Sequence, residues 1–342
     1  MKKLSIFVAV SIILNVFVAC TSNTESDNKT SKQSDPLPSW NDGQAKASII
    51  NYVDEVTNTE SGKYINIPDR VAVFDNDGTI WSERPLYFQF YFAMDRVKAL
   101  APEHPEWKTE QPFKGILEND PNALMASGSE GIGKVLAVTH SGTTVAEFHQ
   151  LVSNWIQTAK HPTKDKPYTD LVYEPMLELL AYLQDNSFTT YIVSGGSIEF
   201  MRPIICDIYN IPVNQILGTS FKTVYKYNDG KPFLERYPEM DFYNDKGDKA
   251  VNIQKIIGKK PIFCGGNSDG DLAMMQWTAS NSLPSFMLYV HHTDSIREWA
   301  YDRKSHIGRL DKGLDQANKD GWTVIDMKKD WKVVFPFELM ER

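Results

Sequence analysis

The chain has 342 residues, and 42% of them are hydrophobic, which is enough to bury a large core in one domain or in a core with an inserted module. Its net charge of −8 excludes a dedicated nucleic-acid-binding protein, because such a protein needs a basic face toward the phosphates. A small anionic substrate is still compatible with this charge, since the local field in a cleft can oppose the net charge.

The N-terminus has the pattern of a targeting signal. Lys2 and Lys3 precede an apolar run over residues 4–19, and Cys20 follows it. We expect residues 1–20 to be a signal peptide of the lipoprotein type, because Phe17-Val18-Ala19-Cys20 resembles a bacterial lipobox. Ordinary cleavage and an uncleaved anchor are the alternatives. The polar residues 21–38 read as a flexible tether, so the protein is expected to be exported and anchored in the cell envelope only through a lipid on Cys20.

Short apolar runs alternate with helical patterns along residues 39–342, which is typical of an α/β domain with a parallel sheet flanked by helices. The runs at 71–74, 191–193 and 262–264 predict buried strands, and 285–290 predicts one more. Helices are predicted at 175–186, 197–205 and 293–301, and a hairpin around Asn228-Asp229-Gly230. Because ligands bind at the carboxyl ends of parallel strands, the residues after these strands should meet at one edge.

A long segment over about residues 82–170 shows helical periodicity and little strand signal. One of its helices is predicted over 144–159, with Thr143 as its cap. We expect this segment to be a helical cap inserted into the α/β core.

The first chemical motif is Asp75-Asn76-Asp77-Gly78-Thr79, directly after the first strand. Asp75 at a strand end can attack phosphorus, and Asp77 can protonate the leaving oxygen and then activate water. The Asp75 carboxylate and the Asp77 main-chain carbonyl are hard oxygen ligands for Mg²⁺, and Thr79 is expected to contact the phosphate. An EF-hand calcium loop is excluded, because it needs glycine at its sixth position and here glycine is the fourth residue.

Three later motifs supply the remaining groups. Ser194 and the amide of Gly195 follow the second strand and can hold phosphoryl oxygens. Lys246 precedes a helical pattern and can neutralise charge on the nucleophile and the phosphoryl group, with Lys249 as the alternate. The loop after the third strand offers oxygen ligands that can complete the magnesium site, namely Asn267, Asp269 and Asp271, of which Asn267 and Asp271 are the expected ligands.

Together these four motifs resemble the haloacid dehalogenase superfamily of phosphohydrolases over about residues 71–275. The resemblance implies a Rossmann-like core with a cap, Asp75 as nucleophile, Asp77 as general acid and base, Ser194 as the phosphate-binding hydroxyl, and Lys246 as the charge-neutralising lysine. The insertion between the first two motifs looks like the helical cap of phosphoserine phosphatase and phosphorylcholine phosphatase. Asn267 departs from the family pattern, which has aspartate there; an amide can donate an oxygen to Mg²⁺ but brings no charge.

The expected activity is Mg²⁺-dependent hydrolysis of a small phosphate ester. The alternatives are a binding lipoprotein that has lost turnover and a phosphotransferase that uses an alcohol in place of water. Two substrate features stand out after the first motif. Glu83 and Arg84 follow it closely enough to contact a substrate headgroup such as that of phosphoserine. An aromatic cluster in the same region is expected to form the core of the cap rather than a site for a cation. Its members are Trp81, Tyr87, Phe88, Phe90, Tyr91 and Phe92.

Overall fold

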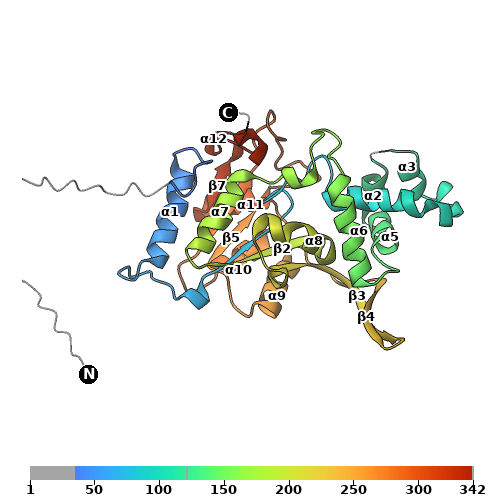
Figure 1. Cartoon of the computed structure of the whole chain (residues 1–342). Coiled ribbons are helices and arrows are strands. Elements are labelled where there is room, and N and C mark those ends of the chain that lie inside the picture. Colours follow the sequence, from blue (N-terminus) through green and yellow to red (C-terminus); the bar gives the residue numbers. More distant parts are fainter. Residues whose placement is uncertain (1–34, 121, 341–342) are drawn as a thin grey trace, which may run out of the picture. The chain divides into compact units, whose positions relative to one another are not determined.

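A seven-stranded sheet forms the centre of the fold in the computed structural model, which describes residues 35–120 and 122–340 (Figure 1). The strand order is β4-β3-β2-β1-β5-β6-β7, and all neighbours are parallel except β3 and β4. The strands are β1 (Val71–Phe74), β2 (Thr189–Ser197), β3 (Ile216–Asn228), β4 (Lys231–Phe242), β5 (Phe263–Gly266), β6 (Phe286–His291) and β7 (Thr323–Asp326). The predicted α/β fold and its four predicted strands are confirmed, and β7 was not predicted.

The central strand β1 lies between β2 and β5, with Val73 opposite Tyr191 on one side and Cys264 on the other. All four β1 residues are buried, which explains why the run has no polar alternation. Asp75 follows directly, and its amide donates to the carbonyl of Gly265 on β5. The end of β1 is therefore fixed in the middle of the sheet, where side chains from both neighbouring strand ends reach it.

Helices cover both faces of the sheet. Ala72 and Phe74 pack with α1, α7 and α8 on one face, whereas Val71 and Val73 pack with α9, α10 and α11 on the other. The helices are α1 (Gln44–Thr57), α2 (Phe88–Leu100), α3 (Phe113–Leu117), α4 (Ala123–Ala126), α5 (Gly128–Thr139), α6 (Val145–Thr158), α7 (Glu174–Asp185), α8 (Ile198–Tyr209), α9 (Gly247–Ile256), α10 (Leu272–Ala279), α11 (Lys312–Asp320) and α12 (Met327–Asp330). The predicted helices at 175–186 and 197–205 correspond to α7 and α8.

Helices α2 to α6 occupy the predicted cap segment and gather on one side of the sheet (Figure 1). Several of them share a small apolar core of their own, formed by residues that include Val97, Trp107 and Val135. The β3–β4 hairpin also contacts the cap, since α5 and α6 both pack against β4. The predicted turn at Asp229-Gly230 is confirmed, and both residues have the positive φ values (49° and 77°) that suit a two-residue hairpin loop.

Two local predictions are wrong. The cap of α6 is Thr144, not Thr143: the Thr144 hydroxyl accepts from the amide of Glu147, whose carboxylate accepts from the amide of Thr144. Residues 293–301 form turns rather than a helix. There the Asp294 carboxylate accepts from the amides of Ile296 and Arg297, so a side chain takes the place of helical carbonyls.

The predicted signal peptide, Cys20 and most of the predicted tether lie outside the described residues. Within residues 35–120 and 122–340, no helix combines the length and the apolar character needed to cross a bilayer.

Candidate active site

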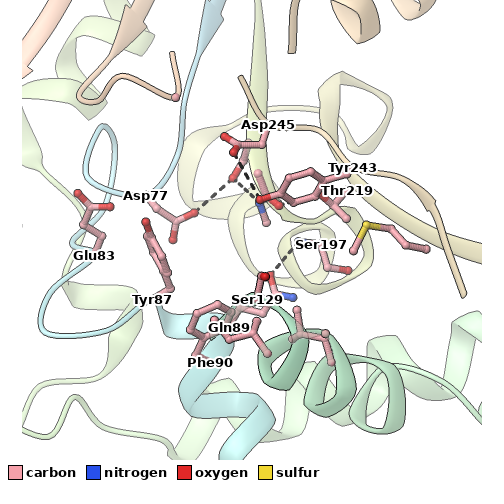
Figure 2. Close-up of a pocket in the computed structure, with 18 of the residues that line it drawn as sticks. Asp77, Glu83, Tyr87, Gln89, Phe90, Ser129, Ser197, Thr219, Tyr243 and Asp245 are labelled. Atoms are coloured by element: carbon pink, nitrogen blue, oxygen red, sulfur yellow. Dashed lines mark hydrogen bonds between the residues drawn. The ribbon is translucent and has the colours of Figure 1, made fainter. Parts of the chain in front are cut away.

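A cavity of about 560 Å³ lies where the carboxyl ends of β1, β2 and β5 face the cap. Asp75, Asp77 and Ser194 line it from the core, and Lys249 and Ser268 complete that end. Gln89 and Ser129 line it from the cap side, opposite Tyr243 and Asp245 (Figure 2). Residues from all four motifs, far apart in the sequence, therefore meet at one edge of the sheet, as parallel topology predicts.

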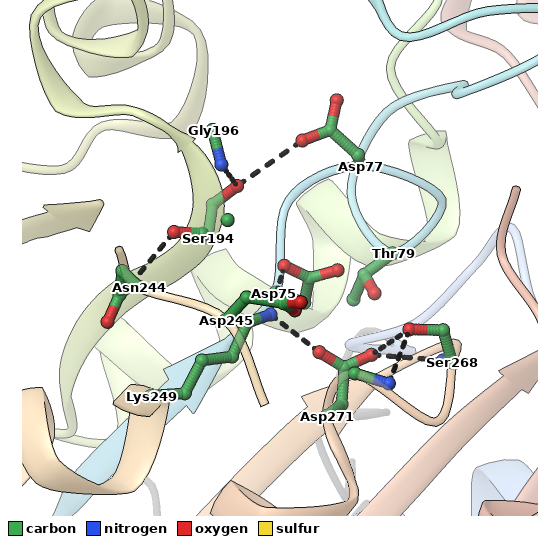
Figure 3. A network of polar contacts seen from close by, with 12 residues as sticks. Asp75, Asp77, Thr79, Ser194, Gly196, Asn244, Asp245, Lys249, Ser268 and Asp271 are labelled. Carbon is green, nitrogen blue, oxygen red and sulfur yellow. Dashed lines mark hydrogen bonds and ion pairs between the residues drawn. The ribbon is translucent and has the colours of Figure 1, made fainter. Parts of the chain in front are cut away.

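Asp75 belongs to a buried ion-pair network with Lys249 and Asp271 (Figure 3). The Lys249 Nζ atom lies 2.6 Å from Asp75 Oδ1 and 2.6 Å from Asp271 Oδ1. Burial and the nearby Asp271 raise the pKa of Asp75, whereas Lys249 lowers it. For Lys249, burial alone would lower the pKa, but the two carboxylates raise it above its ordinary value. Lys249 is therefore a fixed cation beside the Asp75 carboxylate.

The lysine that the structure brings to Asp75 is Lys249, so the choice of Lys246 over its alternate was wrong. Lys246 is exposed and has a left-handed backbone (φ 53°) just before α9 begins at Gly247. Lys249 lies inside the first turn of α9 and shares its buried face with Asn252 and Ile253. This i, i+3, i+4 spacing was the sequence signal that distinguished the two lysines.

Asp77 and Ser194 point toward each other where they line the cavity (Figure 3). The Ser194 hydroxyl donates to Asp77 Oδ2 at 3.3 Å, and the indole N–H of Trp81 donates to Oδ1 at 3.0 Å. Burial raises the pKa of Asp77, although both hydrogen bonds oppose that shift. A carboxyl group with a raised pKa retains its proton more readily, which suits the predicted general acid.

The end of β2 contains Ser194 and the two glycines, which the sequence predicted to follow the strand, and hydrogen bonds hold this segment in place. The Asn244 side chain donates to the Ser194 carbonyl at 2.8 Å, and the Gly196 amide donates to the Ser194 hydroxyl at 3.0 Å (Figure 3). Asn244 is itself buried and accepts from Asn252 on α9. Ser194 and Gly195, both predicted phosphate contacts, thus line the cavity in a fixed position.

Asn267 lies between two partners. Its Nδ2 donates to Glu83 Oε1 at 2.7 Å, and its Oδ1 accepts from the Thr79 hydroxyl at 3.2 Å. Tyr301 also donates to Glu83 Oε1, at 2.7 Å, and burial raises the pKa of Glu83 well above its usual value. Thr79 is fully buried and is not among the residues that line the cavity, so it holds Asn267 rather than the expected phosphate.

The two remaining acidic residues of the fourth motif have anchoring positions. Asp271 Oδ2 accepts from the amides of Asn267 and Ser268, while its Oδ1 binds Lys249. Asp269 Oδ1 accepts from the amides of Asp311 and Gly313 at the start of α11. Neither carboxylate lines the cavity. The structure therefore places Asp271 behind Lys249 and not, as expected, among the groups facing the cavity.

The donor set fits a hard divalent cation. Among the described residues that line the cavity, four carboxylates (Asp75, Asp77, Glu83, Asp245) face one cation, Lys249, and a phosphate would add further negative charge. No group of three or more His, Cys, Asp or Glu side chains in the described part of the chain is arranged to hold a metal. A cation here would therefore depend on the Asp75 carboxylate and the Asp77 carbonyl. The expected ligand Asn267, like Asp271, does not line the cavity, and its amide oxygen accepts from Thr79, so Asn267 would have to exchange that bond for the metal.

The residues after the first motif divide between the cavity and the core. Tyr87, Phe90 and Glu83 line the cavity, whereas Phe88 and Phe92 pack in the main core. The expectation that the aromatic cluster forms the core of the cap is therefore wrong for most of its members, since only Phe90 packs against the cap core and Phe90 also lines the cavity. Arg84 does not line the cavity: its guanidinium lies 4.8 Å from the centre of the Tyr301 ring and 5.9 Å from that of Trp299.

Sequence reasoning missed two partners in this site. Glu83 was considered only as a headgroup contact, although it binds the fourth-motif amide directly. His292 donates from Nε2 to the Gly78 carbonyl at 2.7 Å and stacks on Tyr301, with ring centres 4.3 Å apart. No short spacing links residues 83, 292 and 301 to the motifs, so only the fold brings them together.

A comparison with solved structures finds chains that are similar to this one, and the first of them supports the fold. A solved structure from Anaerococcus prevotii, described as a conserved functionally unknown protein, has 15% identity and a TM-score of 0.52, covering 82% of this chain and 90% of the other. A protein of unknown function from Bordetella pertussis has 14% identity and a TM-score of 0.45, covering 75% and 98%. A phosphoserine phosphohydrolase-like protein from Francisella tularensis has 17% identity and a TM-score of 0.36, covering 65% and 87%.

A search of curated proteins finds no match. The family model for haloacid dehalogenase-like hydrolases matches residues 72–276, a span that contains Asp75, Asp77, Ser194, Lys249 and Asn267. The chain belongs to the haloacid dehalogenase-like hydrolase family.

Proposed function

We propose that this protein is a Mg²⁺-dependent phosphatase that hydrolyses small phosphate monoesters through phosphorylation of Asp75. The observation that carries the proposal is the pairing of the buried Asp75 carboxylate and the half-buried Asp77 carboxylate at one end of the cavity. Asp75 lies 2.6 Å from the Lys249 ammonium, and Asp77 accepts a hydrogen bond from Ser194. One carboxylate is thus held beside a cation, and the other is held where burial raises its pKa.

The first step in this proposal is attack of an Asp75 carboxylate oxygen on phosphorus, which forms an acyl phosphate and breaks the bond to the ester oxygen. Asp77 donates its proton to that oxygen, so the alcohol leaves in its neutral form. Asp77 then accepts a proton from water as the water attacks the acyl phosphate, which releases phosphate and restores Asp75. Ser194 and the Gly195 amide are placed to orient the phosphoryl oxygens.

Magnesium, when bound, would reduce repulsion between the phosphoryl oxygens and the carboxylates. The residues proposed to hold it are Asp75, Asn267 and the main chain of Asp77. Lys249 adds a second positive charge that does not depend on metal binding, because Asp271 keeps it in place. Because Lys249 and Mg²⁺ would both supply positive charge and four carboxylates already line the site, a neutral amide at Asn267 is tolerable.

The test is phosphate release by the purified protein from an aryl phosphate and a panel of small esters. We expect release with Mg²⁺, loss of release with chelator, and loss in Asp75→Asn. Asp248→Asn is the matched control, because Asp248 is an exposed residue on α9 outside the cavity. Mass spectrometry of acid-quenched Asp77→Asn should show phosphate on Asp75. Equal release by wild type and Asp75→Asn would contradict the proposal and leave a binding protein as the better interpretation.

We further propose that the reaction occurs outside the cytoplasmic membrane, on the basis of the signal-like segment over residues 1–20. Labelled palmitate should be incorporated into the wild-type protein and not into Cys20→Ala. Fractionation should release Cys20→Ala from the membrane with its phosphatase activity intact. Incorporation of label in both proteins would contradict lipidation at Cys20.

A further inference from the structure

The cavity is chemically divided. Its carboxylates lie at the end that faces the strand termini: Asp75, Asp77 and Glu83 come from β1 and the loop after it. Asp245 belongs to the same end, because its Oδ1 lies 3.1 Å from the position of a Cβ on Gly270 and 4.0 Å from one on Gly195. Charge is thus concentrated where the phosphate and the metal would bind.

The opposite end of the cavity is apolar. Phe90 on α2 and the half-buried Ile132 and Leu136 on α5 face Phe221 on β3 across it, and Met125 and Met240 complete this wall. None of these six side chains carries a charge. Ser129 and Gln89 are the polar cap residues at its margin (Figure 2).

The apolar wall on α5 adjoins the packing core of the cap, against which Ile132 and Leu136 also pack. Ile132 and Leu136 are one helical turn apart and line the cavity, whereas Val135 is fully buried on another side of α5 within the cap core. Val138, on a further side, is 37% exposed. The apolar packing of α5 therefore continues from the cap core to the cavity surface, where Ile132 and Leu136 are available to a ligand.

An anionic headgroup has no partner in this cavity. Among the described lining residues, Lys249 is the only cation, and Asp75 and Asp271 already bind it. Arg84, the other candidate near the first motif, stacks on Tyr301 outside the lining. A carboxylate such as that of phosphoserine would be placed against aliphatic and aromatic carbon without an ion pair, which is unfavourable.

We propose, building on the phosphatase function above, that the preferred substrates are phosphate esters of uncharged, largely apolar alcohols. The leaving group lies against Phe90, Ile132, Leu136 and Phe221, while the phosphate lies among Asp75, Ser194 and Lys249. A volume of about 560 Å³ is within the range of pockets that enclose whole ligands of this kind. The positions of Glu83 and Arg84 in the sequence favoured phosphoserine as a substrate. The lining of the cavity favours a neutral ester instead.

Primary alkyl phosphates test the proposal, because the leaving oxygen stays chemically similar along the series. From ethyl through butyl to hexyl phosphate, kcat/KM should rise by up to about fourfold for each added methylene that reaches the apolar wall. Phosphocholine and 3,3-dimethylbutyl phosphate have the same shape, but only phosphocholine carries a positive charge on its alcohol. We expect kcat/KM to be at least about tenfold higher for 3,3-dimethylbutyl phosphate. A flat alkyl series, or preference for phosphocholine or phosphoserine over the neutral esters, would overturn the proposal.

A variant pair assigns the effect to the α5 wall. Leu136→Lys should remove the gain from ethyl to hexyl phosphate and raise relative activity on phosphoserine, whereas Val138→Lys, on the exposed side of the same helix, should keep the wild-type pattern. Calorimetric binding to Asp75→Asn tests the cavity without turnover: hexyl phosphate should bind more tightly than ethyl phosphate. Equal binding of the two esters would refute the proposed preference for apolar alcohols, even if the protein is a phosphatase. Tighter binding of hexyl phosphate without any Asp75-dependent release of phosphate would refute only the proposed phosphatase function.

Discussion

The amide nitrogen of Asn267 donates to Glu83 Oε1 at 2.7 Å, so a buried carboxylate lies directly beside the amide that replaces the expected aspartate. The Thr79 hydroxyl donates to the other end of this amide. These two bonds assign the orientation of the Asn267 side chain, with its nitrogen toward Glu83 and its oxygen toward Thr79. Glu83 thus supplies an acidic group beside the fourth motif without belonging to it.

This relationship predicts that Asn267→Asp is unfavourable on its own. The new carboxyl group would lie at hydrogen-bond distance from Glu83 Oε1, so two acidic groups would share one buried site, and we expect the free energy of unfolding of the metal-free protein to fall by about 2 kcal/mol. Adding Glu83→Gln should restore most of it, because the new amide can donate to the new carboxylate. Urea unfolding in chelator measures the four proteins of this cycle. Additive effects of the two substitutions would show that the pair is not coupled.

A second prediction concerns the two lysines near α9. Lys249→Met should lower kcat by at least about 100-fold, because it removes the positive charge 2.6 Å from Asp75. Lys246→Met, at an exposed position just before the helix, should stay within about twofold of wild type, an effect typical of an exposed side chain. Steady-state hydrolysis of one ester at saturating Mg²⁺ compares them, with circular dichroism to confirm folding. The reverse order of effects would return the assignment to Lys246.

A site residue could be predicted from the sequence where the pattern that marks it lies within a few neighbouring residues. Asp75, Asp77 and Ser194 follow uninterrupted apolar strands, so their position at one sheet edge followed from parallel topology alone. Lys249 depended on where α9 begins, and helix ends are the least certain feature of a sequence pattern. Asn267 and Tyr301 meet Glu83 only through tertiary packing, which no local spacing encodes.

Gly78 provides a third prediction. Its φ of 75° is in the left-handed region, and a Cβ there would lie 2.0 Å from Asn267 Nδ2 and 2.4 Å from Glu83 Oε1. Gly78→Ala should therefore lower the free energy of unfolding by more than about 2 kcal/mol. Gly133→Ala is the matched control: Gly133 is inside α5 with open space around its Cβ position, so this change should raise stability by about 0.5–1 kcal/mol. Denaturant midpoints report both effects, and equal shifts in the two variants would contradict the geometry.

The last prediction concerns a hydrogen-bond chain between the cap and the core. The Ser197 amide donates to Gln89 Oε1 at 2.8 Å, and the Gln89 amide group donates to His140 Nε2 at 3.0 Å. His140 Nδ1 lies 2.9 Å from the Thr139 hydroxyl, which itself donates to the Val135 carbonyl at 2.7 Å. We therefore assign the proton to Nδ1 of a neutral imidazole, with Nε2 as an acceptor.

Burial, with Arg236 and Arg96 nearby, lowers the pKa of His140 to about 3. The unfolded chain therefore takes up a proton below about pH 6.5 that the folded chain does not bind, so stability is lost as the pH falls. Relative to His140→Gln, which cannot titrate, the wild type should lose about 2.5 kcal/mol of unfolding free energy between pH 6 and pH 4. Urea unfolding at several pH values gives both curves. Other titrating groups contribute equally to both proteins, so a difference between the curves reports His140. Parallel curves would show that His140 is already charged in the folded state. The hydrogen bonds that link Ser197 to His140 would then not require a neutral ring.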